Sequence, residues 1–159
     1  MPTLVLMRHA KAGTGVRDFD RPLRAEGRQQ AAWVGSILAA RMNGADLAIV
    51  SAAKRAQETF EGLKSGGLTF RQAWIEDFMY DASWDELTVA LRDIPREVRS
   101  VVVVGHEPTM SATTELLSDG TYQLPQGFPA GTCAIGTVED WAYVGSHSLH
   151  ITDVLTPPM

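Results

Sequence analysis

Residues 101–108 of this chain read Val-Val-Val-Val-Gly-His-Glu-Pro, and this stretch decides the fold class. Four consecutive β-branched residues without polar alternation are typical of a strand with both faces covered, as in a parallel sheet between layers of helices. Pro108 can occupy the first turn of a helix, which we expect to run to about Leu117. The stretch therefore predicts a buried strand that delivers His106 and Glu107 to the start of a helix.

The same alternation of strand and helix extends in both directions from this stretch. Upstream we expect strands over Thr3–Met7, Leu47–Val50 and, as an edge strand, Leu68–Trp74, with helices over Ala25–Met42, Ala53–Lys64 and Trp84–Arg92. Downstream, residues 119–131 are rich in Gly and Pro and indicate a surface loop, followed by strands over Thr132–Val138 and Ser148–Leu155 that can pair antiparallel. The pattern predicts a layered α/β domain with a largely parallel sheet.

Composition narrows the class of protein. A chain of 159 residues with 45% hydrophobic and 21% charged residues fits one globular domain over residues 1–159. No run approaches the ~20 apolar residues of a membrane helix, and the N-terminus does not resemble a signal peptide, so we expect a cytoplasmic protein with no membrane partner. The net charge of −5 argues against nucleic acid as a partner. Cys133 is the sole cysteine, which excludes an internal disulfide and a thiolate metal cluster.

Three of the expected strands end in reactive residues. They are followed by Arg8-His9, by Ser51-Ala52-Ala53-Lys54-Arg55 and by Gly105-His106-Glu107-Pro108. In open α/β sheets, ligands bind at the carboxyl ends of strands, where helix N-termini direct free N–H groups outward. We therefore expect two arginines and two histidines to meet at one edge of the sheet, where they would form an anion site.

These motifs resemble those of the histidine phosphatase superfamily. The matching segments, in the order in which the family has them, are Arg8-His9-Ala10-Lys11, Asp18-Phe19-Asp20-Arg21-Pro22-Leu23, Ser51-Ala52-Ala53-Lys54-Arg55-Ala56-Gln57-Glu58-Thr59 and Gly105-His106-Glu107-Pro108. The short length and the Asp-Arg-Pro-Leu segment look like the SixA-like phosphohistidine phosphatase branch. The resemblance spans roughly residues 3–118. It implies a three-layer α/β sandwich of the phosphoglycerate mutase type, with a mostly parallel central sheet flanked by helices.

The resemblance also implies residue roles. His9 matches the nucleophile that carries the phosphoryl group, whereas Arg8, Arg55 and His106 match the residues that hold the phosphate oxygens. The sequence departs from the family pattern at Ala10, where glycine is usual, and at Ala52, where proline is usual. Alanine is small at both positions, so we expect the site to survive. No metal and no cofactor is implied.

The chemistry of phosphoryl transfer suits these residue types. Arginine binds phosphate oxygens through a planar fork, and positioned cations stabilise the charge that spreads over the equatorial oxygens. The nucleophile must be a neutral imidazole, and two neighbouring arginines should lower the pKa of His9. We expect its other nitrogen to donate to a backbone carbonyl. We expect His106 to be protonated when a phosphate dianion is bound.

The general acid is left open by the sequence. Glu107 directly follows His106, Asp81 and Glu76 lie in the segment before the helix expected over Trp84–Arg92, and Asp18 lies on the loop after His9. A protonated imidazole leaves phosphorus easily, whereas an alkoxide needs an acid. A phosphohistidine substrate would therefore tolerate the lack of an acid better than a sugar phosphate would.

The leading hypothesis is a metal-independent phosphatase acting through phospho-His9 on a phosphorylated protein, with an open pocket to which Lys11 and Arg21 could contribute. Small phosphoesters or pyrophosphates are the alternative substrates. A phosphomutase and a phosphate-binding regulatory module without turnover are the other readings. His147 and His150, three apart in an expected strand, would face opposite sides and make a poor metal pair.

Overall fold

The computed structural model describes residues 1–158 and contains one six-stranded sheet. The strands are β1 (Thr3–Arg8), β2 (Ala45–Ser51), β3 (Phe70–Glu76), β4 (Ser100–Gly105), β5 (Cys133–Thr137) and β6 (His150–Leu155). The helices are α1 (Ala25–Met42), α2 (Lys54–Ser65), α3 (Trp84–Arg92) and α4 (Thr109–Leu117). Three short 3-10 helices join them: η1 (Asp18–Asp20), η2 (Asp77–Tyr80) and η3 (Trp141–Tyr143). Within the described residues, no helix is both long and apolar enough to cross a bilayer.

The sheet is mixed, with strand order β3-β2-β4-β1-β5-β6. The first four strands in this order pair in parallel, whereas β5 pairs antiparallel with both β1 and β6. In the centre, Leu4 of β1 lies opposite Val101 of β4, and Arg8 lies opposite Gly105. This register brings the carboxyl ends of β1 and β4 level, so the residues that follow each strand emerge side by side.

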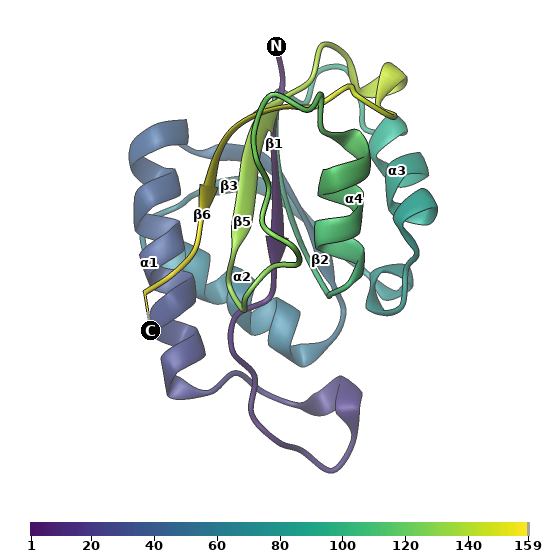
Figure 1. Cartoon of the computed structure of the whole chain (residues 1–159). Coiled ribbons are helices and arrows are strands. Elements are labelled where there is room, and N and C mark those ends of the chain that lie inside the picture. The colour runs from purple at the N-terminus through teal and green to yellow at the C-terminus, as the bar shows by residue number, and fades with distance from the viewer. Residues whose placement is uncertain (159) are drawn as a thin grey trace.

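Alternate residues of the central strands supply two separate cores. Leu4 and Leu6 pack in a cluster with side chains of α3 and α4, and Val5 and Met7 pack in a second cluster with side chains of α1 and α2. The four valines of β4 are fully buried and divide between the same two clusters. Helices thus cover both faces, and Figure 1 shows α1 and α2 on one side and α3 and α4 on the other. The predicted three-layer α/β sandwich with a mostly parallel sheet is confirmed.

The element boundaries follow local sequence signals. Helix α1 ends at Asn43, which adopts the left-handed conformation (φ 54°) that the Asn-Gly pair favours. Helix α3 begins with a capping box, in which Ser83 and Glu86 each accept a hydrogen bond from the backbone N–H of the other. Edge strand β3 and the antiparallel pairing of β5 with β6 are as predicted.

Two strands begin two residues later than the sequence predicted, and the first of them is β3, which spans Phe70–Glu76 rather than Leu68–Trp74. We expected Ser148–Leu155, but β6 begins at His150. Ser148 closes a tight turn in which its hydroxyl and its backbone N–H both donate to the carbonyl of Gly145. His147 has φ 65° in this turn, so the expectation that it faces away from His150 along a strand does not apply.

A long loop, residues 9–24, connects β1 to α1 at the carboxyl edge of the parallel strands. In Figure 1 it hangs below the sheet and carries η1 before the chain enters α1. Its ends are held by pairing of Ala12 with Leu23. This arrangement places Asp18 and Arg21 close to the residues that leave β1, β2 and β4.

Candidate active site

His9 leaves the carboxyl end of β1 and is only 7% exposed. Its backbone N–H donates to the carbonyl of Gly105 in β4, so the two strand ends are joined at this point. Its Nδ1 lies 2.7 Å from the carbonyl oxygen of Ala10. Because a carbonyl oxygen can only accept, Nδ1 carries the proton and Nε2 carries the free lone pair. The expected backbone partner of His9 is therefore present.

The pKa of His9 is lowered from 6.5 to about 4. Burial is the largest cause, because it penalises the charged ring; the positive charges of Arg55, Arg8 and Arg21 contribute less, and the hydrogen bond to Ala10 opposes them. The predicted direction is confirmed, but the cause is corrected: desolvation outweighs the arginines. At neutral pH the ring is an uncharged imidazole.

Two arginines flank His9 with donors that remain available. Arg8 uses Nη1 to donate to the carbonyl of Phe128 at 2.7 Å. Arg55, in the first turn of α2, donates from Nη1 to the carbonyl of Asp18 (2.8 Å) and from Nη2 to its carboxylate (3.1 Å). The Nε atoms of both arginines are buried and have no hydrogen-bond partner among the described residues. Such orphaned donors are costly to bury, which makes the two guanidinium groups candidates to bind an additional acceptor.

His106 lies beside His9, with 5.3 Å between the ring centroids. Its Nε2 pairs with the Ser51 hydroxyl at 2.8 Å, and its Nδ1 is buried without a partner within residues 1–158. Burial is the largest cause that lowers its pKa to about 3, followed by electrostatic repulsion from His9 and from Arg55. Both rings are thus uncharged at neutral pH, and protonation of His106 upon dianion binding stays a prediction.

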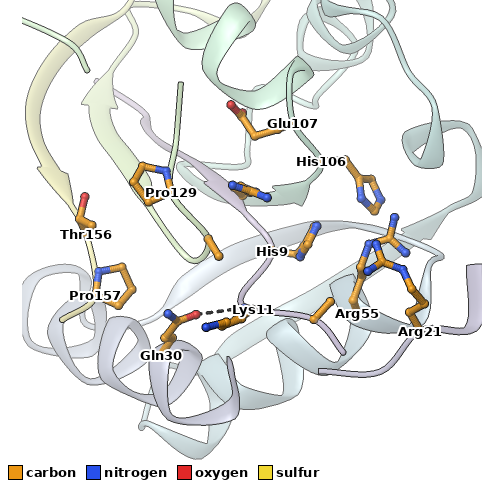
Figure 2. Close-up of a pocket in the computed structure, with 13 residues that line it drawn as sticks. His9, Lys11, Arg21, Gln30, Arg55, His106, Glu107, Pro129, Thr156 and Pro157 are labelled. Carbon is orange, nitrogen blue, oxygen red and sulfur yellow. Dashed lines mark hydrogen bonds between the residues drawn. The ribbon is translucent and has the colours of Figure 1, made fainter. Parts of the chain in front are cut away.

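These groups line a pocket of about 520 Å³. Its walls are Arg8, His9, Lys11, Ala12, Arg21, Gln30, Arg55, His106, Glu107, Pro129, Ala130, Thr156 and Pro157. Figure 2 shows two ends: His9, His106, Arg55 and Arg21 gather at one, and Gln30, Pro129, Thr156 and Pro157 surround the other. Both Lys11 and Arg21 lie in the pocket wall, where the sequence suggested that they could contribute. Lys11 pairs with Glu26 at 3.3 Å, which offsets its charge.

The candidate acids occupy different positions. Glu107 is part of the pocket wall, but in Figure 2 its carboxyl group is directed toward α4 rather than toward His9. It accepts hydrogen bonds from the backbone N–H of Ser111 (2.8 Å), the Ser111 hydroxyl (2.6 Å) and the N–H of Phe128 (3.0 Å). Neither Asp81, which is exposed, nor Glu76 lines the pocket. Asp18 does not line the pocket, and it contacts the pocket wall through the side chains of Arg55 and Arg21.

Several contributors were missed by the sequence analysis. The end of the pocket away from His9 and His106 is lined by Gln30 of α1, by the end of the 119–131 loop and by the residues after β6. Gln30 is buried and its Oε1 accepts the backbone N–H of Lys11, shown dashed in Figure 2. A buried glutamine within the apolar face of an amphipathic helix was the one signal that could have pointed to it.

Other reactive side chains lie elsewhere. Within residues 1–158, no three His, Cys, Asp or Glu residues are grouped so that they could hold a metal ion. His150 pairs instead with Asp119 at 2.8 Å. Cys133 is fully buried in β5, and burial raises the pKa of its thiol to about 12.

The carboxyl edge of this mostly parallel α/β sheet thus holds two neutral histidines and two arginines in one pocket, the arrangement of a candidate anion site in an α/β enzyme. The family model described as "Histidine phosphatase superfamily (branch 1)" matches residues 4–88, and the chain belongs to this superfamily. It is a phosphatase.

Individual relatives agree with this assignment. An uncharacterised protein of Mycobacterium tuberculosis is 31% identical over 148 residues, which cover 87% of this chain and 91% of the relative. Two solved structures of proteins proposed to be the phosphohistidine phosphatase SixA are similar over 99% of this chain. The one from Nakamurella multipartitia has a TM-score of 0.86 at 30% identity (97% of that chain covered), and the one from Agrobacterium tumefaciens has 0.79 at 31% (99% covered). SixA bound to tungstate shares the fold, with a TM-score of 0.83 at 21% identity over 98% of this chain and 97% of that one.

Proposed function

We propose that this phosphatase removes the phosphoryl group from phosphohistidine on proteins, through a phosphohistidine intermediate on Nε2 of His9. The observation that carries the proposal is the hydrogen bond from His9 Nδ1 to the Ala10 carbonyl, which leaves Nε2 as a neutral nucleophile beside unpaired arginine donors. The likeness to the two proteins proposed to be SixA supports the substrate class.

In the first step, the Nε2 lone pair of His9 forms a bond to phosphorus. The bond from phosphorus to the substrate imidazole breaks, and its electron pair stays on that nitrogen. Because the other nitrogen of the substrate ring carries a proton, the leaving group departs as neutral imidazole. Arg8, Arg55 and His106 hold the equatorial oxygens, and charge-assisted hydrogen bonds of this kind contribute about 1.5–3 kcal/mol each.

In the second step, water attacks the phosphorus of phospho-His9. The bond from phosphorus to Nε2 breaks, its electron pair returns to Nε2, and phosphate leaves with both protons of the water. The hydrogen bond to Ala10 keeps the Nδ1 proton in place through both steps, so His9 returns to the same tautomer. Neither step requires a metal ion.

The leaving group argues for phosphohistidine over a sugar phosphate. An alkoxide needs a proton donor, yet the Glu107 carboxylate accepts three hydrogen bonds from groups other than a substrate. The end of the pocket away from Arg55 and Arg21 is lined by Gln30, Thr156 and Pro157, and the charge of the adjacent Lys11 is offset by Glu26, so this end suits an uncharged ring better than a second anionic group. Hydrolysis of small phosphoesters is the alternative function, and the presence of Glu107 in the pocket wall is the observation that favours it.

The test is a rapid-quench experiment without added metal. Wild-type protein and the His9→Ala variant are mixed with a phosphohistidine-labelled carrier protein or with an aryl phosphate. His147→Ala, which changes a histidine outside the pocket, is the matched control. We expect fast loss of phosphohistidine and acid-labile phosphate trapped on wild type and the control, and neither on His9→Ala, with at least a ~1,000-fold loss of rate.

Other outcomes would change the proposal in distinct ways. Turnover of aryl phosphate alone, with a trapped phosphoenzyme, would retain the mechanism and reject the protein substrate. Strong turnover of a sugar phosphate that is abolished by Glu107→Gln would favour the small-molecule alternative. Binding of phosphate without any turnover would favour a regulatory module.

A further inference from the structure

Asp18 is the centre of a hydrogen-bonded cluster behind the pocket. Its Oδ1 accepts from Nε of Arg21 at 3.0 Å, and its Oδ2 accepts from Nη2 of Arg55 at 3.1 Å and from the hydroxyl of Tyr80. Its backbone carbonyl accepts from Nη1 of Arg55 at 2.8 Å. One residue of the η1 segment thus contacts two cations of the pocket wall and one side chain of η2.

Arg55 depends on this contact more than most arginines would. Its side chain is only 7% exposed, and it enters from the first turn of α2, where the helix dipole opposes a positive charge. Among the described residues, Asp18 is the carboxylate that pairs with it. The two contacts from Asp18 hold both Nη atoms and leave Nε as the unpaired donor. The orientation of the guanidinium plane is therefore set by Asp18.

Tyr80 connects the same cluster to the second histidine. Its ring packs edge-on against His106, with 5.7 Å between centroids, and against Phe19 of η1 at 5.1 Å. The Arg55 guanidinium lies 5.8 Å from the centre of the Tyr80 ring. A displacement of Asp18 would therefore be transmitted to Arg55, Arg21 and His106 together.

The same contacts make Asp18 unsuited to donate a proton. Both carboxylate oxygens accept hydrogen bonds from donors that would lose their partner if the group were protonated. The hydrogen bond from Tyr80 is the largest cause that lowers the pKa of Asp18 to about 2, and the charge of Arg55 acts in the same direction.

We propose that Asp18 is a positioning residue rather than the general acid: it orients Arg55 and Arg21 toward the phosphoryl group, and Tyr80 fixes Asp18 in place. The inference rests on the proposed phosphatase function of the same pocket. It assigns a role to the Asp18-Phe19-Asp20-Arg21-Pro22 segment, in which Asp18 and Arg21 form an ion pair across one turn.

The first experiment compares phosphate esters whose leaving groups differ in pKa, from nitrated aryl phosphates to an alkyl phosphate. Asp18→Asn should lower kcat/KM by the same factor, about 10- to 100-fold, for every ester. The reason is that misplaced Arg55 and Arg21 bind the phosphoryl group less well whatever the leaving group. A loss that grows with leaving-group pKa would mean that Asp18 is the acid and would overturn the proposal. The control Asp20→Asn, also in η1 and paired with Arg17 on the surface, should match wild type.

A second variant tests the link to Tyr80. Tyr80→Phe removes only the hydroxyl that donates to Asp18, so it should lower kcat/KM in the same direction but less. The Asp18→Asn/Tyr80→Phe double variant should be no worse than Asp18→Asn alone, because both changes act through one contact. Fully additive losses would overturn the role given to Tyr80.

A third measurement does not depend on turnover. Binding of inorganic phosphate is measured by calorimetry for wild type, Asp18→Asn and Asp20→Asn. Removal of a negative charge near Arg55 would by itself tighten phosphate binding, whereas loss of a positioning group should weaken it several-fold. Tighter or unchanged binding by Asp18→Asn would overturn the proposal. Weaker binding together with a wild type that hydrolyses nothing would uphold the positioning role and reject the proposed function.

Discussion

At the scale of single residues, the site is defined by which groups are buried without charge or without partners. His9 and His106 are both neutral because burial penalises the imidazolium form. Among the described residues the Nε donors of Arg8 and Arg55 are buried without acceptors, and burial of unsatisfied donors destabilises the folded protein. We expect a phosphate that reaches these donors to offset that cost.

The lowered histidine pKa values predict acid sensitivity of the fold. The unfolded chain takes up a proton on each histidine near pH 6.5, whereas the folded protein does so only near pH 4 at His9 and near pH 3 at His106. Protons therefore favour the unfolded state as pH falls below 6.5, and His9 alone would cost on the order of 3 kcal/mol by pH 4.

The measurement is the thermal unfolding midpoint between pH 7 and pH 4. We expect the midpoint of His9→Asn to fall less steeply with decreasing pH than that of wild type. Equal slopes for wild type and His9→Asn would show that His9 titrates normally in the folded protein.

At the scale of elements, close packing of α1 against α2 sets the position of Arg55. A Cβ atom at Gly35 of α1 would overlap the carbonyl oxygen of Leu63 in α2, and one at Gly62 would overlap Ala31. Gly27, at the start of α1, similarly packs against the backbone of Lys11 in the pocket wall. Helix α2 is thus held at a distance that only glycine allows, and that distance places its first turn beside His9.

Gly35→Ala should therefore separate α1 from α2 and destabilise the protein by about 1–3 kcal/mol, although alanine is the better helix former. It should also lower turnover through displacement of Arg55. Chemical denaturation and kcat/KM would be measured together, with Ser36→Ala on the exposed face of the same helix as the control. A Gly35→Ala variant at least as stable as wild type would contradict this packing argument.

At the scale of the whole molecule, the pocket is assembled from segments far apart in the chain. Its walls come from the end of β1, the loop before α1, the first turn of α2, the end of β4, the loop before β5 and the residues after β6. Ligand binding is consequently linked to global folding, since unfolding disperses every contact.

Inorganic phosphate should stabilise the wild-type protein and so raise its thermal unfolding midpoint. At a phosphate concentration of 100 times the Kd, the expected gain in the free energy of unfolding is about 2.7 kcal/mol. Arg8→Ala should lose most of this gain, because Arg8 supplies a buried donor at the pocket. Arg96→Ala, an exposed arginine before the amino end of β4, should keep it. Equal stabilisation of Arg8→Ala would place the phosphate site elsewhere.

Much of this fold follows from local sequence. The run Val101–Val104, the helix ended by Asn43-Gly44 and the edge strand near Trp74 were all predicted, because periodicity and turn residues act over a few positions. The residues that follow the predicted strands also led us to expect Arg8, His9, Arg55 and His106 to be neighbours, because the carboxyl ends of parallel strands lie at one edge of the sheet. The start of β6 was misjudged because the turn at Ser148 depends on a side-chain hydrogen bond that periodicity does not encode.

The sequence by itself determined the fold class, the edge of the sheet at which the candidate site lies and the residue types that meet there. Only the tertiary structure decided how each of them behaves: that Asp18 lies behind Arg55, that Glu107 faces α4, that Gln30 and Thr156 close the far end, and that burial rather than the arginines keeps His9 neutral. The physical reason is that strand order and periodicity are local properties of the chain. Burial, electrostatic environment and hydrogen-bond partners arise from contacts between segments that are distant in sequence.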